Sequence, residues 1–67
     1  MDFPTSLRRI RDERGIVQRE IAAALNVSLK TVSHWETGYS EPSIEQLKAL
    51  AKFLDVTVGE LIGAEVI

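Results

Sequence analysis

Residues 18–35, QREIAAALNVSLKTVSHW, decide the fold. Apolar residues recur at helical spacing on both sides of a short break at residues 26–28, which predicts two helices joined by a tight turn. A connection this short forces the two helices to cross at a large angle. The small Ala22 suits their closest approach, and Asn26 tolerates the positive φ that the turn requires. The buried contacts of the pair are expected from Ile21, Leu25, Val27, Val32 and Trp35.

Sequence on both sides of this stretch predicts three further helices and no strand. The inner face of a first helix consists of Phe3, Leu7, Ile10 and Arg14, with Gly15 as its stop. Ser43 and Gln46 form a capping-box pattern that opens a fourth helix. The apolar stripe of that helix consists of Ile44, Leu47, Leu50, Ala51 and Leu54. Thr57 and Glu60 repeat the capping pattern for a short fifth helix that ends near Ile62.

The 67 residues predict one all-α domain of five helices over residues 1–67, with a core over about 3–62 and a short tail at 63–67. A composition of 45% hydrophobic and 27% charged residues is typical of a folded domain rather than a disordered chain. From the spacing alone, the helix pair at its centre has a generic αα-hairpin of a helical bundle as its alternative.

The composition argues against most catalytic and membrane functions. The absence of cysteine excludes disulfides, thiolate zinc sites and a cysteine nucleophile, and His34 has no second histidine with which to bind a metal. No glycine-rich phosphate loop is present, so we expect no enzyme activity, no cofactor and no small-molecule substrate. No apolar run reaches the roughly 20 residues of a membrane span, and residues 1–4 do not start a signal peptide. We therefore expect a soluble cytoplasmic protein.

Charge is distributed unevenly along a chain whose net charge is −2. Residues 1–40 contain six basic and five acidic side chains, whereas residues 41–67 contain two basic and five acidic ones. An anionic partner should therefore meet the first part of the chain, although the low net charge argues against strong nonspecific binding to polyanions.

The sequence resembles the helix-turn-helix domains of Cro and the lambdoid phage repressors, the XRE-like family. The resemblance covers about residues 3–62 and is carried by residues 7–11, 18–22, 27–36, 42–43 and 47–51 together with Gly15, Gly38, Leu54, Val56 and Leu61. It implies a lambda repressor-like domain that binds double-stranded operator DNA, usually as a homodimer, to regulate transcription, with repression as the expected sign.

Two positions depart from this resemblance. The family usually has Ser, Thr or Asn before the second helix, where this chain has Val17, so only Glu20 is left as half of a capping box. An alternative role for Val17 is to pack against Ile21 as a hydrophobic staple. Asn26 replaces the more usual glycine of the turn. Both changes predict lower local stability within an unchanged architecture.

The resemblance also implies the residues that contact DNA. The helix over about residues 29–36 should lie in the major groove, where its outer side chains would contact bases: Leu29, Lys30, Ser33 and His34. Phosphate contacts are expected from Gln18, Ser28, Thr37 and Ser40. The alternatives are an ordinary exposed helix face for the first set, an N-cap for Ser28, and solvated polar side chains for Gln18, Thr37 and Ser40.

Four further residues are interpreted, the first two of them by the same resemblance. Arg11 and Glu36 should form a partly buried, structural ion pair, while Trp35 shares its helical phase with Val32 and belongs to the core. Tyr39 is left between loop packing and a phosphate contact. The alternative to a DNA-binding regulator is a helix-turn-helix module, antitoxin-like or co-regulatory, that binds mainly protein, and the acidic balance of the chain favours it slightly.

Overall fold

The computed structural model describes residues 3–63, which form five α-helices and no strand. The helices are α1 (Phe3–Glu13), α2 (Gln18–Leu25), α3 (Leu29–Thr37), α4 (Ile44–Leu54) and α5 (Val58–Ile62). The predicted all-α, five-helix fold is therefore confirmed, with helix ends within one residue of those expected. Over residues 3–63, none of the helices has the length and hydropathy needed to cross a bilayer.

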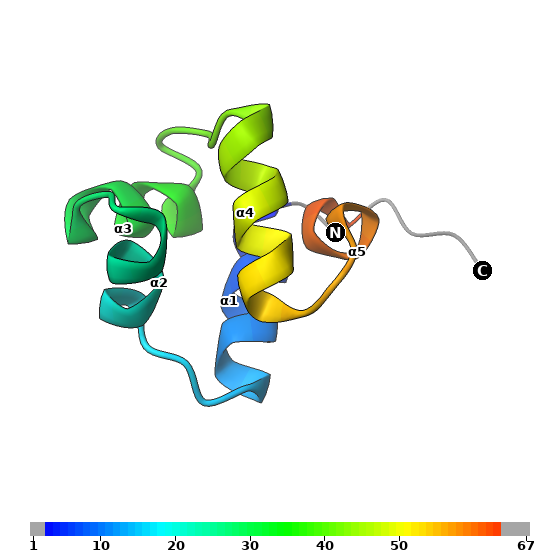
Figure 1. Cartoon of the computed structure of the whole chain (residues 1–67). Coiled ribbons are helices and arrows are strands. Elements are labelled where there is room, and N and C mark those ends of the chain that lie inside the picture. The colour runs from blue at the N-terminus through cyan, green and yellow to red at the C-terminus, as the bar shows by residue number, and fades with distance from the viewer. Residues whose placement is uncertain (1–2, 64–67) are drawn as a thin grey trace.

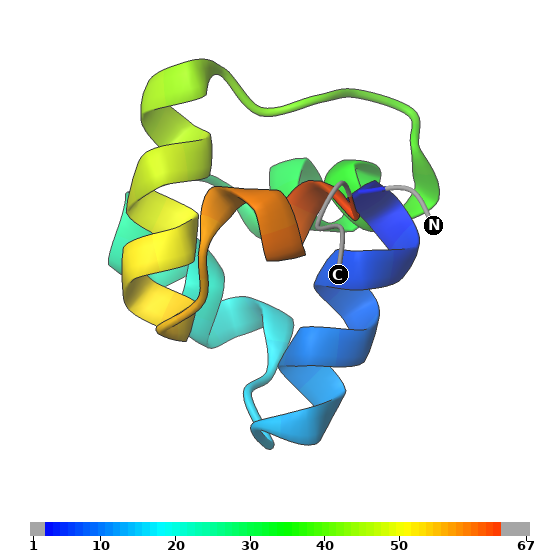
Figure 2. The same ribbon diagram turned by 90° about the vertical axis from the view of Figure 1, so that its right-hand side faces the viewer.

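The five helices pack around one core (Figures 1 and 2). The α2–α3 pair occupies one side of the molecule, α5 occupies the opposite side, and α1 and α4 lie between them. Helix α1 contacts both α3 and α5, while α2 contacts α3 and α4. The inner side of the α2–α3 pair therefore packs against α1 and α4, and its outer side faces away from the rest of the domain.

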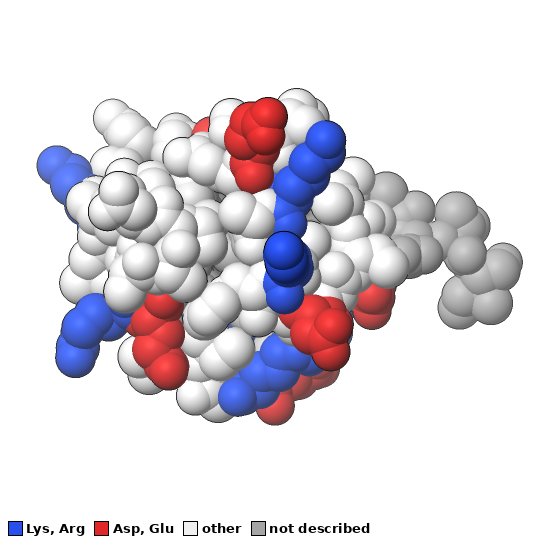
Figure 3. Space-filling model, in the orientation of Figure 1, with Lys and Arg blue, Asp and Glu red and all other residues white. Residues whose placement is uncertain are grey.

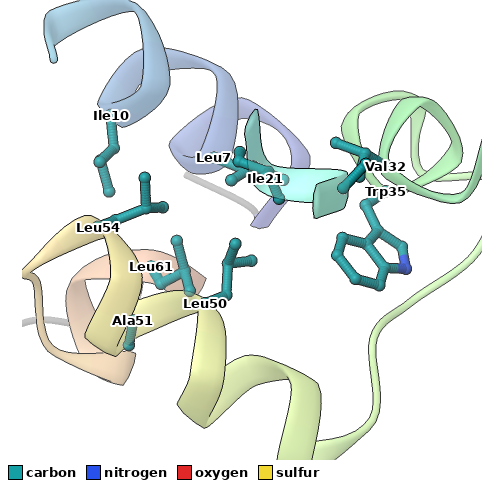
Figure 4. Close-up of a cluster of buried hydrophobic side chains, with 10 residues drawn as sticks. Leu7, Ile10, Ile21, Val32, Trp35, Leu50, Ala51, Leu54 and Leu61 are labelled. Carbon is teal, nitrogen blue, oxygen red and sulfur yellow. The ribbon is translucent and has the colours of Figure 1, made fainter. Parts of the chain in front are cut away.

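All five helices contribute to the hydrophobic core (Figure 4). Its fully buried side chains are Leu7, Ile10, Ile21, Val32, Trp35, Leu50, Leu54 and Leu61. Trp35, at 1% exposure, confirms the core assignment made from its helical phase. The prediction for Ile44 is wrong, because its side chain is 67% exposed. Helix α4 begins at this residue, and its first turn extends past the helices that cover its later turns (Figure 1).

Short polar side chains start three of the helices. The hydroxyls of Ser28, Ser43 and Thr57 each accept a hydrogen bond from the backbone N–H three residues ahead, at 2.9–3.1 Å. The start of α2 differs, since Val17 has no acceptor in its side chain and only the reverse bond forms, from the Val17 N–H to the Glu20 carboxylate at 2.8 Å. The N–H of Glu20 donates to the carbonyl oxygen of Val17 at 3.0 Å, without the additional acceptor that a hydroxyl would supply.

Left-handed residues and one arginine end the helices. Asn26 and Asp55 follow α2 and α4 with φ of 57° and 59°, a conformation that short polar side chains tolerate better than others do. Arg14 lies just past the end of α1 rather than on its inner face, and its Nε donates to the carbonyl oxygen of Leu54 at 2.7 Å. This bond satisfies a carbonyl at the end of α4 and ties α1 to α4.

Replacing Val17 by serine should stabilise the protein. The new hydroxyl would accept from the N–H of Glu20 and complete the capping box, which is worth about 0.5–1.5 kcal/mol. Little packing is lost, because Val17 is 52% exposed and Ile16, rather than Val17, packs against the core. Urea denaturation of Val17→Ser, with Val17→Ala as the control that lacks a hydroxyl, measures the effect. Equal destabilisation by both variants would show that the valine methyl groups matter more than the cap.

Candidate nucleic-acid interface

The turn between α2 and α3 is built from three consecutive residues. Asn26 adopts the left-handed conformation, and the N–H of Val27 then returns to the carbonyl oxygen of Ala22 at 3.0 Å. Val27 packs against the core, which fixes the direction in which α3 starts. Ser28 caps α3 through the N–H of Thr31, and its hydroxyl also lies 2.9 Å from the Thr31 hydroxyl. The orientation of α3 is therefore set by backbone bonds, a cap and one partly buried side chain.

The two sides of α3 differ completely in exposure. Val32, Trp35 and Glu36 are buried against the rest of the domain. The four predicted base-contact residues are on the other side of the helix: Leu29 and Lys30 are exposed, and Ser33 and His34 are half-buried. The structure thus brings these four side chains together on one accessible surface. Leu29 is unusual there, because an aliphatic side chain that is 50% exposed gains little from the fold itself.

A buried carboxylate ties the start of α2 to the end of α3. Glu36, only 4% exposed, accepts two hydrogen bonds from Arg11, from Nε at 2.6 Å and from Nη2 at 3.0 Å. The Nη1 of Arg11 donates to the carbonyl oxygen of Ile16 at 3.1 Å. Glu36 also accepts from the Nε2 of Gln18 at 3.0 Å. One carboxylate therefore joins α1, the first residue of α2 and the last turn of α3.

The hydrogen bonds to Glu36 affect both its basic partner, Arg11, and its neutral partner, Gln18. The hydrogen bond to Glu36 raises the pKa of the Arg11 guanidinium above its usual value, so this partner keeps its positive charge. For Gln18, the bond to Glu36 uses one of the two amide hydrogens. The second amide hydrogen and the amide oxygen remain available to a ligand, and the bond to Glu36 fixes where they lie.

A hollow of about 360 Å³ lies beside the start of α2, lined by Arg11, Val17, Gln18, Arg19 and Leu29. Its polar side chains are hydrogen-bond donors of the kind that bind phosphate oxygens, and its apolar ones can contact a thymine methyl group. Arg19 was not among the residues expected from the sequence. Its only signal there is a basic side chain in the first turn of a helix, next to Gln18.

The remaining predicted phosphate contacts lie elsewhere around α3. Ser28 precedes the helix as its N-cap, and Thr37 ends it with its hydroxyl donating to the carbonyl oxygen of His34 at 3.2 Å. Ser40 is half-buried in the following loop, on a hollow of about 410 Å³ formed with the start of α1 and the end of α5. The structure therefore does not bring these three together with Gln18 into one cluster.

Charges of both signs are interspersed on the molecular surface (Figure 3). Basic side chains project at the edge of the molecule where α2 and α3 lie, and others follow α4, with acidic side chains between them. The α2–α3 surface is thus only moderately positive.

Over residues 3–63, no group of three or more histidine or acidic side chains is arranged to hold a metal ion.

Residues 7–61 match the model of the helix-turn-helix family. The chain belongs to this family. One relative, the transcriptional activator BcrR of Enterococcus faecalis, is 37% identical over 97% of this chain and 32% of its own length. Another, the cryptic phage CTXphi repressor RstR of Vibrio cholerae, is 35% identical over 91% of this chain and 55% of its own. The chain therefore spans about a third to a half of these relatives.

Solved structures of this family superpose closely on the domain. A transcriptional regulator from Listeria innocua has a TM-score of 0.87 at 34% identity, over 97% of this chain and 61% of that one. The P22 c2 repressor, solved in complex with a synthetic operator, has a TM-score of 0.88 at 28% identity, over 97% of this chain and 98% of that one. The resemblance to the lambdoid phage repressors is confirmed by these similarities.

Removing the Glu36 carboxylate should destabilise the domain far more than removing an exposed one. Glu36→Ala leaves Arg11 and Gln18 without their shared partner, at a cost of about 3 kcal/mol for a largely buried pair. Glu45→Ala, in the exposed first turn of α4, should cost less than about 1 kcal/mol. Thermal and urea unfolding of both variants measure the difference. Equal effects would show that Glu36 contributes no more than a solvated side chain.

Proposed function

We propose that the protein binds double-stranded DNA sequence-specifically as a transcriptional regulator, with α3 in the major groove. The observation that carries this proposal is the accessible row of side chains on α3, beside an α2 start that is fixed by the buried Glu36 carboxylate. It is supported by membership of the helix-turn-helix family and by the likeness to a repressor that was solved with its operator. Helix-turn-helix domains are DNA-binding domains rather than an enzyme class.

Three side chains of α3 have the chemistry to distinguish base pairs. Lys30 can donate to the O6 and N7 of guanine, and His34 can donate or accept at a base edge. Leu29 can pack on the methyl group of thymine, which accounts for an exposed leucine at the start of the helix. Ser33, half-buried next to His34, adds a hydroxyl that can bond to any base.

Phosphate contacts would fix the position of α3 along the groove. Gln18 presents its free amide hydrogen at the start of α2, where backbone N–H groups and the helix dipole favour an anion. Arg19 lines the same hollow and adds the positive charge that Gln18 lacks. Ser28, Thr37 and Ser40 supply hydroxyls before and after α3, and a capping hydroxyl can also donate to a phosphate oxygen.

Repression is the proposed sign of regulation, and the cytoplasm is the proposed location. The RstR and P22 c2 proteins are named repressors, whereas BcrR is named an activator. A reporter gene placed downstream of a DNA site that the protein selects shows whether the protein represses or activates transcription. The competing proposal, a module that binds mainly protein, predicts no preferred duplex in the same selection.

Base-contact and phosphate-contact residues should have separable effects on binding. Replacing Lys30 or His34 by alanine should cost about 1–3 kcal/mol on the preferred duplex and relax the preference at particular base pairs. Replacing Gln18 by alanine should weaken binding to preferred and scrambled duplexes alike, because phosphate contacts carry no sequence information. Fluorescence anisotropy with both duplexes measures these affinities. An unchanged base preference in both Lys30→Ala and His34→Ala would exclude α3 as the reader.

The salt dependence of binding provides a second readout from the same titrations. A net charge of −2 and few basic side chains beside α3 predict a shallow slope of affinity against salt. Gln18→Ala should leave this slope unchanged, whereas Arg19→Ala should reduce it by about one phosphate contact. Because Gln18 also bonds to Glu36, the unfolding midpoint of Gln18→Ala is the control that the domain remains folded at the assay temperature.

We also propose that the protein binds its operator as a homodimer. Two half-sites on DNA lie about 34 Å apart, and the nine-residue α3 of one copy cannot reach both. The proposed contact surface is the α4–α5 side of the domain, where Phe53 and Ile62 are 40% and 38% exposed. The sequence also suggests the tail for this interface through Val66 and Ile67, which lie outside the described residues.

A charge on the α4–α5 side should weaken self-association. Ile62→Glu places a carboxylate on the proposed contact surface, where burying it without a partner is costly. We expect at least a tenfold weaker dimer, whereas Ala24→Glu, on the exposed side of α2, should leave dimerisation unchanged. Sedimentation velocity over a range of concentrations, with and without duplex, measures both. An unchanged dimer in Ile62→Glu would place the interface elsewhere.

A further inference from the structure

His34 and Tyr39 form an aromatic pair at the end of α3. Their ring centroids lie 4.5 Å apart, with the ring planes tilted by 47°. Tyr39 is 80% exposed, so the core does not hold its ring. An exposed tyrosine with this contact has its ring beside one of the four side chains on the accessible surface of α3.

The backbone dictates that these two residues meet. Gly38 has a φ of 82°, a left-handed conformation that reverses the chain directly after α3. The N–H of Tyr39 then donates to the carbonyl oxygen of His34 at 3.0 Å, and the Thr37 hydroxyl donates to the same oxygen. The Tyr39 backbone is therefore anchored one turn back along the helix, where its ring can contact the imidazole.

We propose that Tyr39 is a positioning residue for base recognition, because its ring fixes the orientation of the His34 imidazole toward the major groove. This inference rests on the proposed function, in which His34 contacts a base. The ring torsion of histidine is broad, and a half-turn about the Cβ–Cγ bond puts Cδ2 and Cε1 where Nδ1 and Nε2 were, so the donor and the acceptor of the ring both move. A neighbouring ring restricts that torsion before DNA arrives, so less side-chain entropy is lost on binding.

A different role for Tyr39 makes a different forecast. If its phenol hydroxyl donated to a phosphate, it would stabilise complexes with every sequence equally and would act independently of His34. If its ring positions His34, the hydroxyl is dispensable and the effect disappears without the histidine. The geometry favours the ring, because the contact to His34 is already made in the free protein.

The experiment compares Tyr39→Phe, Tyr39→Ala, His34→Ala and the double alanine variant on a duplex selected by this protein and on its single base-pair variants. Tyr39→Phe should bind as the parent protein does. Tyr39→Ala should lower affinity for the selected duplex by about 3- to 10-fold and relax the preference at the same base pair as His34→Ala. Its affinity for scrambled duplex should not change. In the His34→Ala background, Tyr39→Ala should have no further effect.

Two results would overturn the inference while leaving the proposed function intact. One is a loss for Tyr39→Phe on selected and scrambled duplexes alike, which assigns the hydroxyl to a phosphate, or a loss for Tyr39→Ala that persists without His34, which shows that Tyr39 does not act through the histidine. The other is an absence of change in the free protein. We expect the NMR shifts of the His34 ring protons to move in Tyr39→Ala but not in the loop control Glu41→Ala. Unmoved shifts would show that the rings do not interact. An unchanged base preference in His34→Ala would instead remove His34 as a reader, and the inference with it.

Discussion

The carboxylate of Glu36 is the group on which the geometry of the candidate interface depends. It lies in the last turn of α3, almost completely buried, and receives hydrogen bonds from α1 through Arg11 and from α2 through Gln18. A buried charge is tolerated only when it is paired and hydrogen-bonded, so the three side chains form a unit rather than three independent contacts. Hydrophobic packing holds the five helices together, and this unit fixes the position of Gln18, the first residue of α2, relative to α3.

The two roles expected of this part of the chain are therefore not separate. The sequence assigned Arg11 and Glu36 to structure and Gln18 to DNA binding, whereas in the structure the same carboxylate binds both Arg11 and Gln18. An amide already bonded to the protein has fewer orientations to lose when it meets a phosphate. The stability of the domain and the proposed phosphate contact of Gln18 thus depend on the same carboxylate, that of Glu36.

Local signals in the sequence predicted most of the fold, and long-range contacts were what they could not predict. The capping boxes at Ser43 and Thr57 are patterns within four residues, so they mark helix starts directly. Arg14 was placed on the inner face of α1, but α1 ends one residue earlier and the guanidinium reaches Leu54, forty residues away. No periodic pattern encodes such a bond. Ile44 shared the apolar spacing of its helix, but spacing does not show where the covering helices end.

Some of the geometry of the candidate interface could be predicted from the sequence, and some could not. Helical phase was enough to place Leu29, Lys30, Ser33 and His34 on one side of α3. The Gln18–Glu36 bond and the ring contact of Tyr39 with His34 depend on turns whose geometry appears only in three dimensions. Arg19 was missed for the same reason, because its place in the hollow beside α2 depends on how closely α3 approaches.

The contact between α1 and α5 has a consequence for how the protein is made in the cell. Leu61 of α5 is fully buried against a core that includes Leu7 and Ile10 of α1, so the core closes only when residue 61 is present. A ribosome adding 5–20 residues per second needs about 1–5 seconds to continue from Glu36 to that point. During this interval the residues of α2 and α3 have been synthesised, but the packing that orients the two helices is incomplete. The nascent chain acquires a fixed α2–α3 surface only after residue 61 has been added.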